Sequence, residues 1–104
     1  MEGLELISFQ IISAVGSARS NYIEAISAAR NGEYDRAEEL IKEGEELFVT
    51  GHKAHAELIQ QEANGNKTEV QLLLIHAEDQ LMSAEAFGIL AKEFIEVYKK
   101  IDNK

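Results

Sequence analysis

Apolar residues recur along the chain at intervals of three and four, the spacing typical of amphipathic α-helices. In the first third of the chain the apolar stripe comprises Leu4, Ile7, Ile11, Ala14, Val15, Ala18, Tyr22, Ala25 and Ala29. A second stripe comprises Ala37, Leu40, Ile41, Gly44, Leu47, Phe48, Gly51, His55 and Leu58. The chain contains no proline, the residue that most strongly interrupts helices. The pattern therefore predicts that most of the chain is helical.

Two glycine-containing turns divide this helical pattern. Asn31-Gly32 and Asn64-Gly65-Asn66 can each supply the left-handed residue that ends a helix. Asn66 can also cap the helix that follows, because Glu69 stands three residues later in capping-box spacing.

We therefore expect helices over residues 4–30, 33–63 and 67–101. At about 1.5 Å per residue, each is roughly 40–50 Å long. The predicted fold class is all-α, an antiparallel bundle of three long helices, and residues 1–104 are predicted to form a single domain.

Gly44 and Gly51 lie on the apolar stripe of the second segment, at seven-residue spacing with Ala37 and Leu58. Glycine inside a helix costs about 1 kcal/mol relative to alanine, so its position on the buried stripe indicates close packing of a neighbouring helix. A break in the helix near Thr50-Gly51 is the alternative.

The third segment is apolar on two opposite sides. One stripe comprises Val70, Leu73, Leu74, Ala77, Leu81, Ala84, Gly88, Ala91 and Ile95. The other comprises Leu72, Ile75, Met82, Ala86, Ile89 and Leu90. A helix in a three-helix bundle needs only one buried face, so we expect the second face to meet another copy of the protein. The sequence thus predicts a homo-oligomer with this helix at its centre.

Two polar residues interrupt or border the second stripe. Asp79 lies within it, where a buried carboxylate must be paired, protonated or bound to a cation. One interpretation is a ring of Asp79 carboxylates around a symmetry axis; the other is an interface acid that reaches water. His76, one turn earlier, falls at the edge of the interface groove and could act as nucleophile, base or ligand, or simply form a hydrogen bond there.

His52 and His55 are also one helical turn apart, and His55 is predicted to face the bundle core. A metal site formed by these two histidines is conceivable. However, none of the three histidines has a glutamate three residues before it, so the Glu-x-x-His pattern of di-iron bundles is absent.

Composition narrows the function classes. The chain has 19 acidic and 10 basic residues, a net charge of −9, which disfavours binding to nucleic acid or to anionic lipid. It has no cysteine, so thiol catalysis and cysteine-ligated metals are excluded. Nucleotide-binding glycine motifs, a secretory signal and a transmembrane-length apolar run are also missing, so we expect a cytoplasmic protein without membrane insertion.

Residues 73–82, LLIHAEDQLM, resemble the active-site helix of the IIA component of the lactose/cellobiose-type sugar phosphotransferase system. Residues 16–20 (GSARS), 31–37 (NGEYDRA) and 91–98 (AKEFIEVY) are also similar to that family, so the resemblance covers nearly the whole chain. Some members carry a second histidine after the motif aspartate, whereas this chain has Gln80.

The resemblance implies a homotrimer of three-helix subunits, a nine-helix bundle. It implies that His76 accepts a phosphoryl group from phosphorylated HPr and passes it to a cysteine of the IIB component during sugar import. It also implies that Asp79 lies near the trimer axis and binds a divalent metal such as magnesium. Disaccharides and β-glucosides are the substrates of such systems, and the sequence does not distinguish lactose, cellobiose and chitobiose.

Two other functions fit the pattern of residues. A non-catalytic helical adaptor or assembly scaffold would use His76 and Asp79 only to specify an interface. A histidine phosphotransfer domain of a two-component pathway would also place His76 on a helix, but such domains are usually monomeric four-helix bundles. The three predicted helices and the second apolar face count against it.

Overall fold

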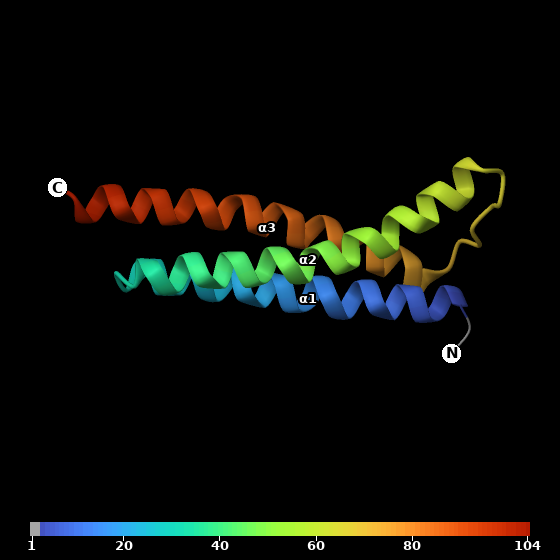
Figure 1. Ribbon diagram of the computed structural model, residues 1–104, viewed down its shortest axis with the longest axis horizontal. Helices are drawn as coiled ribbons and strands as arrows, with labels where there is room; N and C mark the ends of the chain where they lie inside the picture. The colour runs from blue at the N-terminus through green and yellow to red at the C-terminus, as the bar shows by residue number, and fades with distance from the viewer. Residues whose placement is uncertain (1–2) are drawn as a thin grey trace.

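The computed structural model describes residues 3–104, which form three long helices (Figure 1). Helix α1 spans Gly3–Arg30, α2 spans Tyr34–Ala63 and α3 spans Leu72–Asp102. The molecule is elongated, with extents of 56 × 24 × 20 Å. Helix α2 runs antiparallel to its two neighbours, and α1 and α3 begin at the same end of the bundle (Figure 1). The all-α three-helix fold expected from the apolar stripes is confirmed.

Both predicted turns end a helix with a glycine in the left-handed region. Gly32 has φ of 80° and Gly65 has φ of 93°, a conformation that residues with a Cβ adopt only at a cost. The backbone N–H of Gly32 donates to the carbonyl of Ala29 at 3.0 Å, and that of Gly65 donates to the carbonyl of Glu62 at 3.0 Å. The local sequence was therefore sufficient to locate the ends of α1 and α2.

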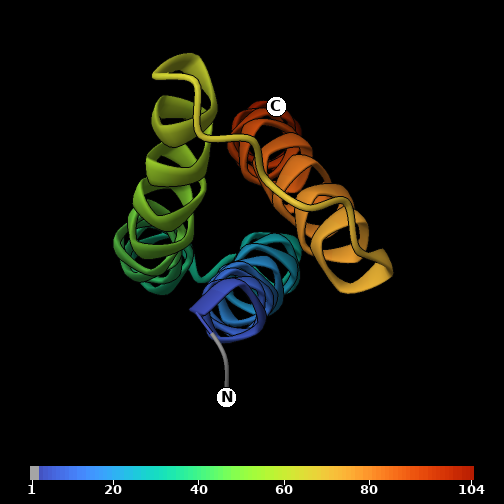
Figure 2. The same cartoon turned by 90° about the vertical axis from the view of Figure 1, so that its right-hand side faces the viewer.

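The start of α3 differs from the prediction. The helix begins at Leu72, not near residue 67, and Gln71 precedes it in an extended conformation without a side-chain cap. The expected pairing of Asn66 with Glu69 is absent, and Val70, expected on the buried stripe, is 80% exposed. Residues 66–71 instead cross the end of the bundle from α2 to α3 (Figure 2). The need to connect two separated helix ends overrides the local helix signals.

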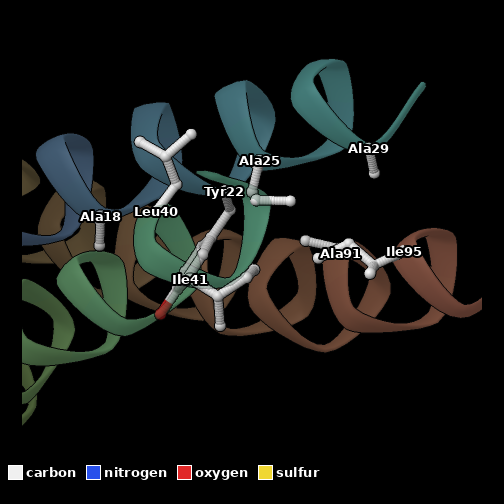
Figure 3. Close-up of a cluster of buried hydrophobic side chains, with 9 residues drawn as sticks. Ala18, Tyr22, Ala25, Ala29, Leu40, Ile41, Ala91 and Ile95 are labelled. Atoms are coloured by element: carbon white, nitrogen blue, oxygen red, sulfur yellow. The ribbon is translucent and has the colours of Figure 1, made fainter. Parts of the chain in front are cut away.

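The core lies along one side of α1, which lies beneath the space between α2 and α3 (Figure 2). Its first cluster comprises Ala18, Tyr22, Ala25, Ala29, Ala37, Leu40, Ile41, Ala91 and Ile95 (Figure 3). Its second comprises Ile11, Val15, Leu58, Leu74, Ala77, Leu81 and Ala84. Helix α2 is continuous through Thr50-Gly51, so the alternative of a break there is wrong.

Candidate functional site

One face of α3 points away from the rest of the bundle and remains uncovered. We call it the α3 outer face; it comprises Leu72, Ile75, Asp79, Met82, Ala86, Ile89 and Leu90, all exposed. Leu72 is 83% exposed, Met82 71% and Ile89 59%. The opposite stripe of the same helix is buried against the other two helices. The prediction that α3 is apolar on two sides, with only one covered within a single chain, is confirmed.

Asp79 lies in the middle of the α3 outer face, one turn after Ile75 and one turn before Met82. Its carboxylate is exposed in the single chain and makes no hydrogen bond or ion pair within residues 3–104. The same part of the chain contains no group of three or more histidines, cysteines and carboxylates that could hold a metal ion. Within a single described chain, Asp79 is thus an isolated exposed carboxylate.

His76 lies at the border between the α3 outer face and α1. It precedes Asp79 by three residues, which corresponds to about 60° around the helix. The imidazole is exposed, and within residues 3–104 neither ring nitrogen takes part in a hydrogen bond or ion pair. Because the site is on the surface of a rigid helix, a second protein can reach the ring without a change in fold. This geometry suits a nucleophile that exchanges a group with partner proteins.

Arg19 on α1 contributes a positive charge on the same side of α3, beside Phe87, which lies eleven residues beyond His76. The spacing of residues did not reveal this contribution. The Arg19 guanidinium lies 5.7 Å from the centre of the Phe87 ring, a cation–π contact between α1 and α3. Lys92, the nearest basic residue after His76 in sequence, instead bonds to Glu45 of α2 at 3.0 Å. The only sequence signal for Arg19 was its place in the family-like stretch GSARS, because its periodicity is that of an ordinary surface residue.

His52 and His55 occupy different environments. The Nε2 atom of His55 lies 2.9 Å from Oε2 of Glu78, which links α2 to α3 at the edge of the core. His52 is exposed and stacks on Phe48, with ring centres 5.9 Å apart. In the part of the chain that the structure describes, the two histidines therefore do not form a metal site.

None of the three helices combines the length and the apolarity that a membrane-spanning segment requires, over the residues described.

Known proteins with the same sequence pattern and fold are IIA components. The profile of the family described as "PTS system, Lactose/Cellobiose specific IIA subunit" matches residues 6–99. The lichenan-specific phosphotransferase enzyme IIA component of Bacillus subtilis is 44% identical over 100 residues, which cover 96% of this chain and 91% of the relative.

Solved structures lead to the same family. The cellobiose-specific enzyme IIA of Bacillus anthracis superposes with a TM-score of 0.97 at 44% identity, covering 100% of this chain and 95% of that one. The chitobiose IIA of Escherichia coli, solved in complex with HPr, gives a TM-score of 0.84 at 28% identity, covering 98% of this chain and 99% of that one. With its exposed histidine on α3, this chain thus belongs to the lactose/cellobiose-specific IIA family and is a phosphotransferase component of a sugar phosphotransferase system.

Proposed function

We propose that His76 is the residue that carries the phosphoryl group, received from phosphorylated HPr and passed to a cysteine of the IIB component. The observation that supports this choice is the exposed imidazole of His76, which makes no hydrogen bond or ion pair within the described chain and lies at the border of the uncovered α3 outer face. His55 is tied to Glu78 and lies between α2 and α3, where a partner protein has poor access to its ring. HPr as the donor is supported by the complex formed by the E. coli relative.

Each of the two steps of the relay is an in-line displacement at phosphorus. A lone pair on one ring nitrogen of His76 attacks phosphorus as the P–N bond to the donor histidine of HPr breaks. In the second step the IIB thiolate attacks, and the P–N bond to His76 breaks and returns the electron pair to the imidazole. Catalysis of such a step depends mainly on positioning and on charge stabilisation.

The charge of this chain favours release of the group. A phosphoryl group adds about −1.5 to −2 charge, here to a chain of net charge −9. Within the described residues no basic side chain contacts His76. Weak neutralisation suits a carrier, because the phosphoryl group must leave again.

Assembly as a homotrimer through the α3 outer face is part of the proposal. Large side chains such as Leu72 and Met82 are more than two-thirds exposed in a single chain, and a patch of this kind is normally covered by a partner. Three copies packed about an axis would bring three Asp79 carboxylates together. A divalent cation, with magnesium the best fit to oxygen ligands, would neutralise their charge.

For the transported sugar we propose a β-glucoside such as cellobiose, because the lichenan-specific and cellobiose-specific relatives are each 44% identical to this chain. The relay is placed in the cytoplasm, where phosphorylated HPr would supply it.

The deciding experiment supplies phosphoenolpyruvate, enzyme I and HPr to the protein and measures its intact mass. We expect one added phosphoryl group per chain, which IIB then removes. His76→Ala should abolish the addition, whereas the control variants His52→Ala and His55→Ala should retain it. Absence of labelling with active HPr would overturn the relay in favour of a scaffold. Labelling of a monomer by a sensor kinase alone would indicate a two-component phosphotransfer domain.

A further inference from the structure

A pocket opens between α2 and α3 directly above Tyr22. We call it the Tyr22 pocket; it has a volume of about 190 Å³, and Tyr22, Glu45, Phe48, Glu85 and Lys92 are among the residues that line it. Its polar groups are two carboxylates, one ammonium and one phenol, a net charge of −1. This composition attracts a cation that can also share a hydrogen bond with a phenol oxygen.

The polar groups of the Tyr22 pocket are incompletely paired. Tyr22 is only 3% exposed as a whole residue, but its hydroxyl oxygen is accessible from the pocket and makes no hydrogen bond within residues 3–104. A hydroxyl at the wall of a pocket can accept a hydrogen bond from a donor that enters the pocket. Glu45 is bonded to Lys92 at 3.0 Å, whereas Glu85 has no ion pair in the described chain. The pocket therefore has one unpartnered hydroxyl and one unpaired carboxylate.

Arg19 presents the complementary group on the other side of α3. Its guanidinium lies over the Phe87 ring at 5.7 Å and forms no hydrogen bond or ion pair within residues 3–104. An arginine without a carboxylate partner is unexpected in a chain with 19 acidic residues. Its guanidinium offers five N–H donors in a planar fork.

Glu85 and Phe87 flank Ala86 on the α3 outer face. Adjacent helical residues are about 100° apart, so Glu85 and Phe87 lie on opposite sides of Ala86. When copies pack in parallel about an axis through this face, the Phe87 side of each α3 meets the Glu85 side of the next. The Tyr22 pocket and Arg19 also lie at the same level along the axis of α3. Tyr22 packs against Gly88, and Arg19 lies over Phe87, one residue earlier.

We propose that Arg19 of each copy enters the Tyr22 pocket of the neighbouring copy. There its guanidinium forms an ion pair with Glu85 and donates a hydrogen bond to the Tyr22 hydroxyl oxygen. The contact is heterologous, and three of them close the ring. The inference rests on the proposed homotrimer and specifies what holds it in register.

The contact also has a consequence for His76. His76 and Phe87 are eleven residues apart, which places them within about 20° of each other around α3. The side of α3 that carries His76 is thus the side anchored by Arg19. Docking of Arg19 would hold the imidazole in the groove between two copies, where an incoming partner protein meets both.

A charge-reversal cycle tests this contact, with trimer dissociation measured by sedimentation equilibrium. Arg19→Glu and Glu85→Arg should each raise the dissociation constant at least about tenfold, and the double variant should recover most of that loss. Arg36→Glu is the matched control, because Arg36 bonds only to Glu39 on the exposed side of α2 and its reversal should leave assembly unchanged. Tyr22→Phe should weaken assembly without loss of helical circular dichroism.

Two outcomes separate the inference from the assembly on which it depends. A wild-type protein that stays monomeric at all concentrations would overturn both the trimer and the contact. A stable wild-type trimer in which Arg19→Glu behaves like Arg36→Glu would leave the trimer intact and overturn the contact alone.

Discussion

The ring of Tyr22 occupies the space that a side chain at Gly44 would need: an added Cβ would lie 2.6 Å from Cε1 of the ring. On the other side, a Cβ added to Gly88 would lie 2.9 Å from Cε2. Tyr22 therefore projects from α1 towards α2 and α3 (Figure 3). A glycine on each of these two helices faces an edge of its ring. At this level of the bundle, the edges of the Tyr22 ring lie against α2 and α3, so the two helices are separated by the width of one aromatic ring.

Gly44→Ala should destabilise the protein, although alanine is the better helix former. The gain in helix propensity is about 1 kcal/mol, whereas forcing a methyl group into a packed core costs about 1–3 kcal/mol. Thermal and urea unfolding at a fixed protein concentration measure the difference. Gly16→Ala is the control, because a Cβ there meets nothing within 4 Å, and it should stabilise. Equal stabilisation by both substitutions would contradict the packing of Tyr22 against Gly44.

Tyr34 should titrate at unusually high pH. Its hydroxyl donates a hydrogen bond to Asp102, and this bond, with smaller contributions from burial and from the Asp102 charge, raises the pKa of Tyr34 from 10.0 to about 12. The neutral phenol is the form that donates. The contribution to stability is therefore complete below pH about 10 and is lost as the pH rises through about 12.

Ultraviolet absorbance of tyrosinate measures this titration in a chain with three tyrosines. Asp102→Asn should return the pKa of Tyr34 towards 10.0. The part of the tyrosinate absorbance that disappears in Tyr34→Phe is the contribution of Tyr34. Burial also raises the pKa of Tyr22, so a high-pH component that persists in Tyr34→Phe belongs to Tyr22. An unchanged titration in Asp102→Asn would refute the contact.

The pair formed by His55 and Glu78 should show a small coupling free energy. The Glu78 side chain is 44% exposed, so solvent screening limits the pair to about 0.5 kcal/mol. A double-mutant cycle of His55→Ala and Glu78→Ala, followed by urea unfolding, measures it. The control is the double-mutant cycle of His52→Ala and Glu78→Ala. Because His52 stacks on Phe48, its coupling free energy with Glu78 should be near zero.

Asp79→Leu should leave the proposed trimer intact or tighten it. An apolar side chain of similar size can replace a cluster of buried carboxylates, and the need for a compensating cation disappears with them. Sedimentation with magnesium and with a chelator measures both effects. The wild-type trimer should dissociate more readily in the chelator, whereas the trimer of the variant should be unaffected. Dissociation of the variant to monomers would show that Asp79 organises the assembly through another contact.

Much of the fold follows from periodicity in the sequence. The spacing of three and four predicted all three helices and most of their buried stripes, although Leu47 and Val70 are exposed, and the two Asn-Gly turns located the ends of α1 and α2. The uncovered outer face of α3 was also predictable. A three-helix bundle buries only one side of each helix, so a helix that is apolar on two opposite sides leaves one of them uncovered. These features are local, since each depends on residues within a few turns of one another.

The start of α3 and the polar contacts between helices depended on the tertiary structure. Residues 66–71 have a capping-box pattern, yet they form an irregular connection because they must join two separated helix ends. The pairing of His55 with Glu78, and the position of Arg19 over Phe87, depend on the relative height and rotation of helices that are distant in sequence. Local sequence signals determine which face of a helix is buried, whereas packing of the whole bundle determines which residues meet across it.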